Sequence, residues 1–317
     1  MAMNIIRLFK SLFSKNKKML IIVGGRVEKI EAFREPAKKM GLDVTLASFS
    51  DLKYAEGGGG KASFSLKIKS VEVSDFDVIY MRMIGKRIED AALLTEYAIQ
   101  KSIKLVDGMY KKSHVYPLSV AKSLEMKRLI EGGLTLPKTL CGSLKTILTD
   151  GPKFLRFPFI IKSTSGRRAR EVWIIENIKE LKAKVTELTP IESAGTKYFA
   201  QEFIKASQRI RVLVVVGRAV AAITRPTKWR KRFIEKVNGE FPEGIKEALS
   251  PIPAEYESLA VNAAKSCDLD VCGVDILVED GTNKTYIIEA NAAPAWKLIK
   301  KDTPVIVEEE ILKFLNK

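Results

Sequence analysis

The sequence predicts an α/β protein built from more than one lobe. The apolar strand Met19–Val23 is followed by a helical pattern that ends at Gly41 and by a second strand near Val44–Ala47, an order that implies a parallel sheet. From Pro117 onward the pattern changes to short apolar strands that return on one another across polar turns. A chain of 317 residues has room for two or three lobes with substantial cores.

The first hundred residues are expected to form one compact α/β domain, which we place at residues 19–107. Val78–Met83 and Ile103–Val106 have the composition of further strands, and Ile88–Lys101 has the apolar spacing of a helix between them. The pair Gly24–Gly25 lacks the spacing of a dinucleotide fingerprint or a Walker loop, so we interpret it as a turn.

Residues 1–18 form a basic amphipathic extension ahead of this domain. Apolar residues fall on one helical face with lysines and arginines around them. Such a helix packs on its own protein, frays, or lies on a partner or an anionic membrane surface. No apolar run is long enough for a transmembrane helix or a signal-peptide core, and the three cysteines form no CxxC pair. We expect a cytoplasmic protein.

A second lobe is expected at residues 108–195. It begins with a helix over about Leu118–Glu131 and contains the strands Phe157–Lys162 and Val172–Ile175, which flank the polar loop Ser163–Arg170. A lysine at the end of an apolar strand, beside a loop of small residues, can clamp a phosphate with its charge and with loop amides. The alternative for Lys162 is an ordinary solvated lysine.

A third lobe is expected at residues 196–317. Arg211–Val216 and Ala219–Thr224 predict a hairpin that turns at Gly217–Arg218, and Ala254–Cys267 predicts a helix. The tail Pro304–Leu315 has the pattern of an amphipathic helix that closes the chain.

A second hairpin in this lobe carries the strongest chemical signal. Two strands rich in Val, Ile and Tyr flank a turn at Asp280–Asn283. If Val278 lies opposite Tyr286, then Asp275 lies opposite Glu289, with Asn291 on the same face. Facing carboxylates repel and destabilise a sheet unless a cation lies between them. Mg²⁺, or Mn²⁺ in its place, takes such oxygen ligands together with phosphate oxygens. A hairpin with solvated acids is the alternative.

The net charge of +16 favours anionic partners, including phosphates, acidic peptides, nucleic acid and anionic membranes. The most basic stretch is Arg225–Lys236, in which basic residues alternate with Trp229 and Phe233. That combination is also found in proteins that bind nucleic acid.

The order of these pieces resembles the ATP-grasp enzymes, and among them the RimK-type amino-acid ligases. The resemblance runs from about Leu118 to Lys300 and rests on five motifs in order. They are Ala121–Lys122 followed by Pro137, Phe159–Lys162 with Gly166, Gln201–Ile204, Ile210–Gly217, and the pair Gly273–Ile276 with Glu289–Pro294.

The resemblance implies an N-terminal small parallel-sheet α/β domain followed by an ATP-grasp fold, in which α+β lobes hold the nucleotide between them. Lys122, Lys162 and the loop at Gly166 then contact nucleotide phosphates. The adenine is hydrogen-bonded by a hinge that consists of Gln201, Glu202, Phe203 and Ile204. Arg211 faces the reacting phosphate, and the metal ligands are Asp275, Glu289 and Asn291.

The implied activity is that of an ADP-forming carboxylate–amine ligase that works through an acyl phosphate, with Arg211 and Lys162 as catalytic residues. Members of the resembled family handle glutamate and acidic acceptors, which agrees with the basic charge. We therefore expect glutamate or a similar amino acid to be joined to an acidic peptide, protein or small molecule. Homo-oligomerisation is left open. Candidate substrate contacts are Arg167, Arg225, Arg230 and Arg232.

Two other functions stay open. A nucleic-acid-binding protein would use residues 225–236, but it leaves the cluster of Asp275, Glu289 and Asn291 unexplained. A non-catalytic binding protein derived from the ATP-grasp fold is favoured by Arg209, since the resembled family usually has an acid at this position.

Overall fold

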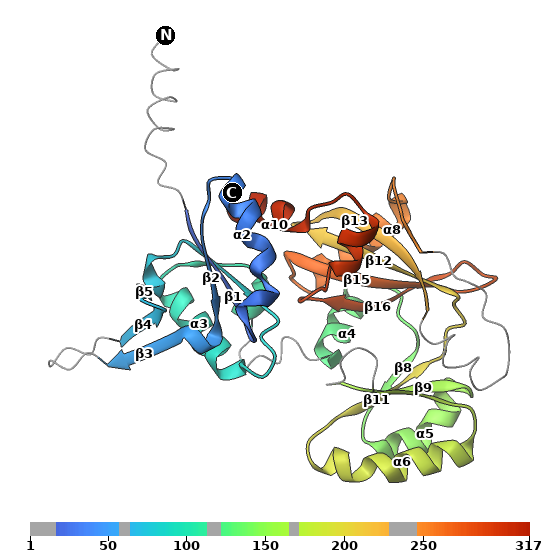
Figure 1. Ribbon diagram of the computed structural model, residues 1–317. Coiled ribbons are helices and arrows are strands. Elements are labelled where there is room, and N and C mark those ends of the chain that lie inside the picture. The colour runs from blue at the N-terminus through green and yellow to red at the C-terminus, as the bar shows by residue number, and fades with distance from the viewer. Residues whose placement is uncertain (1–16, 57–63, 113–121, 165–170, 228–245) are drawn as a thin grey trace. The chain divides into compact units, whose positions relative to one another are not determined.

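The computed structural model describes residues 17–56, 64–112, 122–164, 171–227 and 246–317 (Figure 1). The chain divides into two compact units, one of residues Met1–Lys111 with Ile306–Lys317 and one of Lys112–Val305. The sequence-based division at residues 18, 107 and 195 differs from this one, and its internal boundary at residue 195 stays a prediction.

A parallel sheet forms the core of the first unit. It contains β1 (Lys18–Val23), β2 (Asp43–Ser48), β6 (Val78–Arg82) and β7 (Lys104–Leu105) in the order β2-β1-β6-β7. Met19 to Val23 are all fully buried, as expected for a central parallel strand covered on both faces. The predicted parallel sheet is therefore confirmed. The helix expected before Gly41 is shorter, because two 3₁₀ turns precede α2 (Arg34–Lys39).

The remaining elements of this unit surround the parallel sheet. They are α3 (Ile88–Gln100), a small antiparallel sheet of β3 (Leu52–Glu56), β4 (Phe64–Ile68) and β5 (Val71–Glu72), and the terminal helix α10 (Val307–Leu315). Helix α10 contacts α2, and its Phe314 ring lies 4.5 Å from the Lys104 Nζ. The sequence-based bounds 196–317 put this tail in the C-terminal lobe, whereas the contacts group Ile306–Lys317 with the first unit, because an amphipathic stripe does not specify which lobe covers it.

The second unit begins with α4 (Lys122–Glu131) and an antiparallel sheet in the order β10-β9-β11-β8. The strands are β8 (Thr139–Cys141), β9 (Phe159–Ser163), β10 (Val172–Ile175) and β11 (Tyr198–Glu202). Helices α5 (Leu144–Leu155) and α6 (Ile178–Ser193) share one apolar core with this sheet, in which Ile147, Phe159 and Leu181 are fully buried. Sequence inspection did not predict these two helices.

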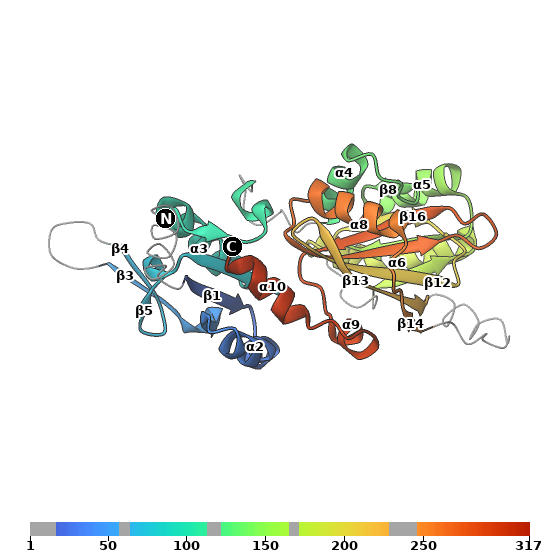
Figure 2. The ribbon, with the colours of Figure 1, turned by 90° about the horizontal axis from the view of Figure 1, so that it is seen from above.

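A five-stranded antiparallel sheet completes the second unit, in the order β14-β13-β12-β15-β16. Its strands are β12 (Gln208–Val215), β13 (Arg218–Pro226), β14 (Glu247–Ala248), β15 (Val271–Val278) and β16 (Thr285–Asn291). Helix α8 (Ala254–Ser266) packs against β12, β13, β15 and β16, and α9 (Lys297–Asp302) contacts β13 (Figure 2). The β12–β13 turn uses Val216 and Gly217, both with positive φ, one residue earlier than predicted.

The two sheets of the second unit leave facing surfaces free of these helices. In Figure 1, α5 and α6 lie on the far side of the four-stranded sheet, whereas α4 lies between the two sheets. Alternation along β12 places Ile210, Val212 and Val214 in the core and leaves Arg209 and Arg211 on the other face. We call this other face of the five-stranded sheet the polar face. Among the described helices, none combines the length and apolarity that a bilayer crossing requires.

Candidate active site

The two carboxylates predicted to face each other do so, although the pairing that suggested them is displaced by one residue. Leu277, not Val278, lies opposite Tyr286. A β-bulge at Ile288 then shifts the register, so that Asp275 pairs with Glu289. Since side chains alternate along a strand, Asp275, Glu289 and Asn291 share one face of the hairpin as predicted.

A close backbone approach shapes the end of this hairpin. Gly273 pairs with Asn291, and a Cβ atom on Gly273 would lie only 2.6 Å from the Cβ of Pro294. Asn291 turns the chain here, because its Oδ1 accepts a hydrogen bond of 2.8 Å from the Ala293 N–H. The glycine therefore allows the loop after β16 to lie against β15, next to the two carboxylates.

Each of the two carboxylates has its own cation. The Arg211 guanidinium donates Nε–H and Nη2–H bonds to the two Asp275 oxygens, both at 2.7 Å. The Lys122 Nζ lies 2.7 Å from Glu289 Oε1. Although burial opposes it, hydrogen bonding to Asp275 raises the pKa of Arg211. The repulsion expected between the facing acids is thus offset by Arg211 and Lys122 rather than left for a metal alone.

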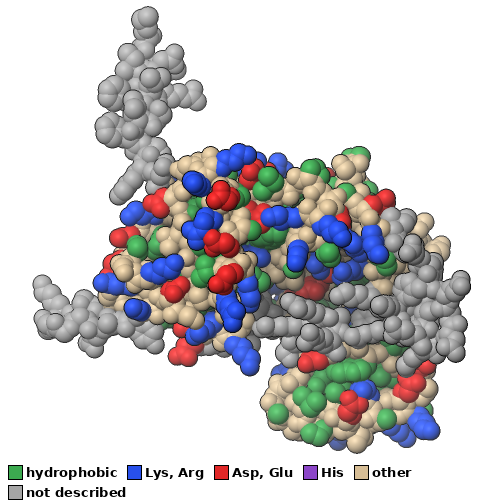
Figure 3. Space-filling model, viewed as in Figure 1, with side chains coloured by type: hydrophobic (Ala, Val, Ile, Leu, Met, Phe, Trp, Pro, Cys, Tyr) green, Lys and Arg blue, Asp and Glu red, His purple; other side chains and the backbone are tan. Residues whose placement is uncertain are grey.

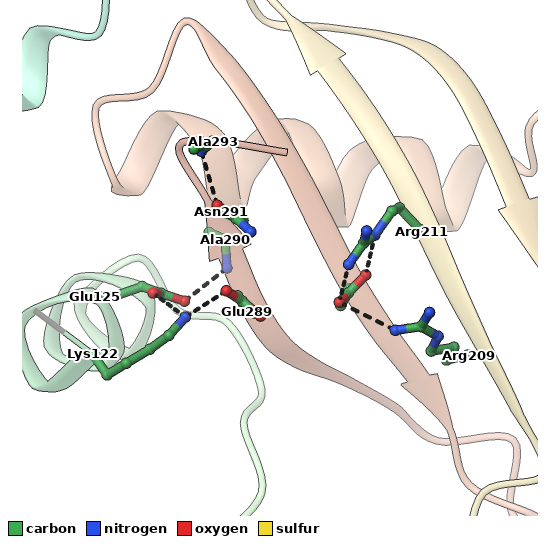
Figure 4. A network of polar contacts seen from close by, with 9 residues as sticks. Lys122, Glu125, Arg209, Arg211, Glu289, Ala290, Asn291 and Ala293 are labelled. Atoms are coloured by element: carbon green, nitrogen blue, oxygen red, sulfur yellow. Dashed lines mark hydrogen bonds and ion pairs between the residues drawn. The ribbon is translucent and has the colours of Figure 1, made fainter. Parts of the chain in front are cut away.

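Glu125 is a member of this network that sequence reasoning missed. Its Oε2 lies 2.9 Å from Lys122 Nζ, and its Oε1 accepts a 2.8 Å hydrogen bond from the Ala290 N–H (Figure 4). Although burial opposes it, the charges of Glu125 and Glu289 raise the pKa of Lys122. The carboxylate therefore joins α4 to β16 and holds Lys122 beside Glu289. The spacing Lys122-x-x-Glu125, which places both side chains on one helical face, was the available signal.

Replacing Glu125 with alanine is expected to lower the free energy of unfolding by about 1–3 kcal/mol, because the Ala290 N–H and Lys122 lose a buried partner. Nucleotide binding should weaken as well, since Lys122 is no longer positioned. Chemical denaturation and calorimetry measure the two effects. The matched control is Glu131→Gln, which removes an exposed acid of the same helix. Equal changes in stability and nucleotide binding in the two variants would show that Glu125 does not position Lys122.

Lys162 lies at the end of β9, as predicted, in a partly buried position. Its Nζ is 2.5 Å from the Gln201 Oε1, and the Gln201 Nε2 donates to the Thr139 hydroxyl at 2.9 Å. Burial lowers the pKa of Lys162 to about 8, and the nearby Lys122 adds to the effect against the attraction of Glu289. An added anion, such as a phosphate, would therefore stabilise the charged form of Lys162.

The hinge residues connect the two sheets of the second unit. Gln201 is buried and its side chain serves Lys162 and Thr139, while Glu202 accepts a hydrogen bond from the Lys138 N–H. Ile204 packs with Leu277 and Tyr286. These side chains are engaged within the protein, so backbone groups of the hinge would have to bind an adenine ring. That contact stays a prediction.

The predicted substrate contacts fall largely outside the described residues. Arg225 is described, and its guanidinium pairs with Asp302 of α9. Figure 3 shows Lys and Arg side chains on both units with acidic ones among them. The residues with a predicted role that lie outside the described ranges include Gly166, Arg167, Arg230, Arg232 and the first sixteen of the extension 1–18. Their assigned roles, and the nucleic-acid role of 225–236, stay predictions.

The donor set at the hairpin suits a hard divalent cation. Asp275 and Glu289 lie directly opposite each other, and Asn291 follows on the same face with an amide oxygen. Within the part of the chain that the structure describes, no group of three or more His, Cys, Asp or Glu side chains forms a metal cluster. The fit to Mg²⁺ therefore rests on two carboxylates and one amide, with phosphate oxygens expected to complete the set.

The fold defines the class of protein. The ATP-grasp ligase PsnB in complex with its minimal precursor superimposes with a TM-score of 0.67 over 95% of this chain and 99% of that one, at 16% identity. The RimK domain ATP-grasp protein of Sphaerobacter thermophilus gives 0.65 over 94% and 98%, also at 16% identity. The chain thus has the predicted ATP-grasp fold.

The family model described as RimK-like ATP-grasp domain matches residues 121–315, so the chain belongs to this family. A probable alpha-L-glutamate ligase of Pasteurella multocida is 28% identical over 203 residues, which are 62% of this chain and 59% of that protein. A protein of the same name from Nitrosococcus oceani is 25% identical over 80% of both chains. Human beta-citrylglutamate synthase B is 28% identical over 55% of this chain and 44% of its own. The chain thus spans less than two thirds of the Pasteurella relative.

Proposed function

We propose that the protein is an ATP-dependent, ADP-forming carboxylate–amine ligase. It joins glutamate or a similar amino acid to an acidic acceptor such as a peptide. The names of the relatives, which include glutamate ligases, support this choice of amino acid. The ATP-grasp ligase PsnB has been solved in complex with the precursor peptide PsnA2, which supports a peptide acceptor.

One observation carries the proposal. Two carboxylates on paired strand positions, Asp275 and Glu289, each have a cation of their own, and a third cation, Lys162, lies within electrostatic reach of Glu289. Each carboxylate in this set therefore has a cation beside it before any ligand binds. The set could also exchange partners, because the carboxylates would hold a metal ion and the cations would offset phosphate charge. PsnB has also been solved with Mg and ADP.

The chemistry needs no nucleophile from the protein. An oxygen of the substrate carboxylate attacks the γ-phosphorus, the bond to the β–γ bridging oxygen breaks, and ADP leaves. The amine then attacks the acyl carbon, the bond to the phosphate oxygen breaks, and the amine loses a proton as the amide forms. Positioning and charge neutralisation supply the catalysis in such a reaction.

Six residues of this chain have three roles in that reaction. Lys122 and Lys162 offset phosphate charge, and Arg211 stabilises the acyl phosphate and the oxyanion formed by the amine. Asp275, Glu289 and Asn291 would hold Mg²⁺, or Mn²⁺ with the same oxygen donors. When bound, the metal would supply further charge neutralisation at the phosphates.

A substrate screen tests the proposal. We expect ADP release only when a carboxylate and an amine substrate are both present, with a product whose mass is their sum less one water. L-Glutamate with short glutamyl peptides is the first combination to try, and amides of the same peptides are the control. ADP release at the same rate with and without the amine substrate would contradict the ligase assignment.

A further inference from the structure

Three guanidiniums lie side by side on the polar face of the five-stranded sheet. Arg209 and Arg211 are two residues apart on β12, and Arg225 lies opposite Arg209 on β13. Side chains that are directly paired or two residues apart on one face are near neighbours. Three like charges at such spacing repel, so each needs an anion nearby.

Two of the three guanidiniums have their anion within the protein. Asp275 accepts two hydrogen bonds from Arg211, and Asp302 pairs with Arg225. Arg209 has no comparable partner among the described residues. Its Nη1 lies 3.7 Å from Asp275 Oδ2, which is too long for a hydrogen bond, and that carboxylate is already engaged by Arg211.

The surroundings of Arg209 make this lack of a partner costly. Its Nε is fully buried and donates no hydrogen bond to any described residue. Burial lowers the pKa of Arg209, and the charges of Arg211 and Arg225 add to the effect against Asp275. Figure 4 shows Arg209 and Arg211 directed to the same small region between β12 and β15. A partly buried cation in such a place is stabilised by an anion from outside the protein.

We infer that Arg209 forms an oxyanion subsite, next to the position assigned to Arg211, that binds a phosphate or a carboxylate group of a ligand. The planar guanidinium fork suits either group. A phosphate of the nucleotide is the expected source, because Arg209 pairs with Leu277, which packs against Ile204 of the predicted hinge. A substrate carboxylate is the other source. The inference rests on the proposed ligase function.

Calorimetric titrations of Arg209→Gln separate the two sources. One pair of probes is ADP and adenosine, and the other is tri-L-glutamate and tri-L-glutamine, all with Mg²⁺. We expect ADP affinity to fall about tenfold to a hundredfold while adenosine affinity is unchanged. A selective loss of tri-L-glutamate binding would support the subsite and assign it to the acceptor. Equal binding of all four probes to the variant and the wild type would overturn the inference.

Stability supplies a second readout. Arg209 has only the long 3.7 Å ion pair with Asp275, so its removal should leave the unfolding temperature of the ligand-free protein unchanged or raise it. Removal of a structural partner of Asp275 should lower that temperature instead. A marked fall would overturn the inference. Arg209→Lys keeps the charge but loses the planar fork, so it should retain only part of the affinity. Arg218→Gln, at an exposed arginine at the start of β13, is the matched control. Wild type that fails to bind ADP would instead remove the proposed function.

Discussion

Asp275→Asn is expected to lower kcat by at least about a hundredfold and to reduce the free energy of unfolding by about 1–3 kcal/mol. The loss of activity follows because the amide is a poor metal ligand and leaves Arg211 without its orienting partner. The loss of stability follows because both hydrogen bonds of Arg211 end on this carboxylate. ADP release and chemical denaturation measure the two effects.

A double variant separates the two effects. In Asp275→Asn with Arg211→Gln, the closest cation of Asp275 is removed together with the carboxylate, and only the longer 3.7 Å ion pair with Arg209 is lost, so most of the stability should recover while turnover stays abolished. Glu279→Gln, just beyond the end of β15, is the control that should leave both unchanged. Turnover near the wild-type level in Asp275→Asn would remove the hairpin from the mechanism.

Lys162→Ala is expected to weaken ATP binding by about tenfold or more, because a partly buried cation is lost near the phosphates. The pKa of about 8 adds a sharper expectation. At about pH 8.5 most of the lysine is neutral, and phosphate binding favours its charged form. Nucleotide binding should therefore take up most of one proton at about pH 8.5 and almost none below about pH 7. Calorimetry of ADP binding in buffers of different ionisation enthalpy measures this uptake.

Lys162→Arg is the matched variant, because arginine keeps the positive charge but does not titrate in this range. It should bind ADP without proton uptake, and unchanged uptake would show that another group titrates. The lowered pKa of Lys162 also makes the stability of the folded protein depend on pH. The folded protein holds fewer protons on Lys162 than the unfolded chain between pH 8 and about 10.4, so this residue's contribution to stability rises with pH across that window.

The hairpin shows how far the sequence can predict the site. Alternation within β15 and β16 was enough to place Asp275, Glu289 and Asn291 on one face. The assumed partner of Val278 was nevertheless wrong, and the bulge at Ile288 compensated for the error. A bulge leaves no composition signal in a run such as Tyr286–Glu289, so the face could be predicted but the register could not.

The pairing of each carboxylate with a cation could not be predicted. Glu289 and Lys122 are far apart in sequence, and their contact depends on how α4 lies against β16. The three-residue spacing of Lys122 and Glu125 does indicate that both lie on one helical face. Only the fold shows that Glu125 also accepts a hydrogen bond from the Ala290 N–H. For the same reason, the amphipathic stripe of α10 predicted a helix but not the unit that buries it.

Isotope transfer tests the central claim most directly. The protein is incubated with ATP, Mg²⁺, L-glutamate and tri-L-glutamate, and the carboxylates of both substrates carry ¹⁸O. The released phosphate is analysed by mass spectrometry. Attack of a substrate carboxylate on the γ-phosphorus predicts that each phosphate released with product carries one ¹⁸O atom, while ADP carries none. Amide product formed with unlabelled phosphate, or with ¹⁸O in AMP, would contradict the acyl-phosphate mechanism.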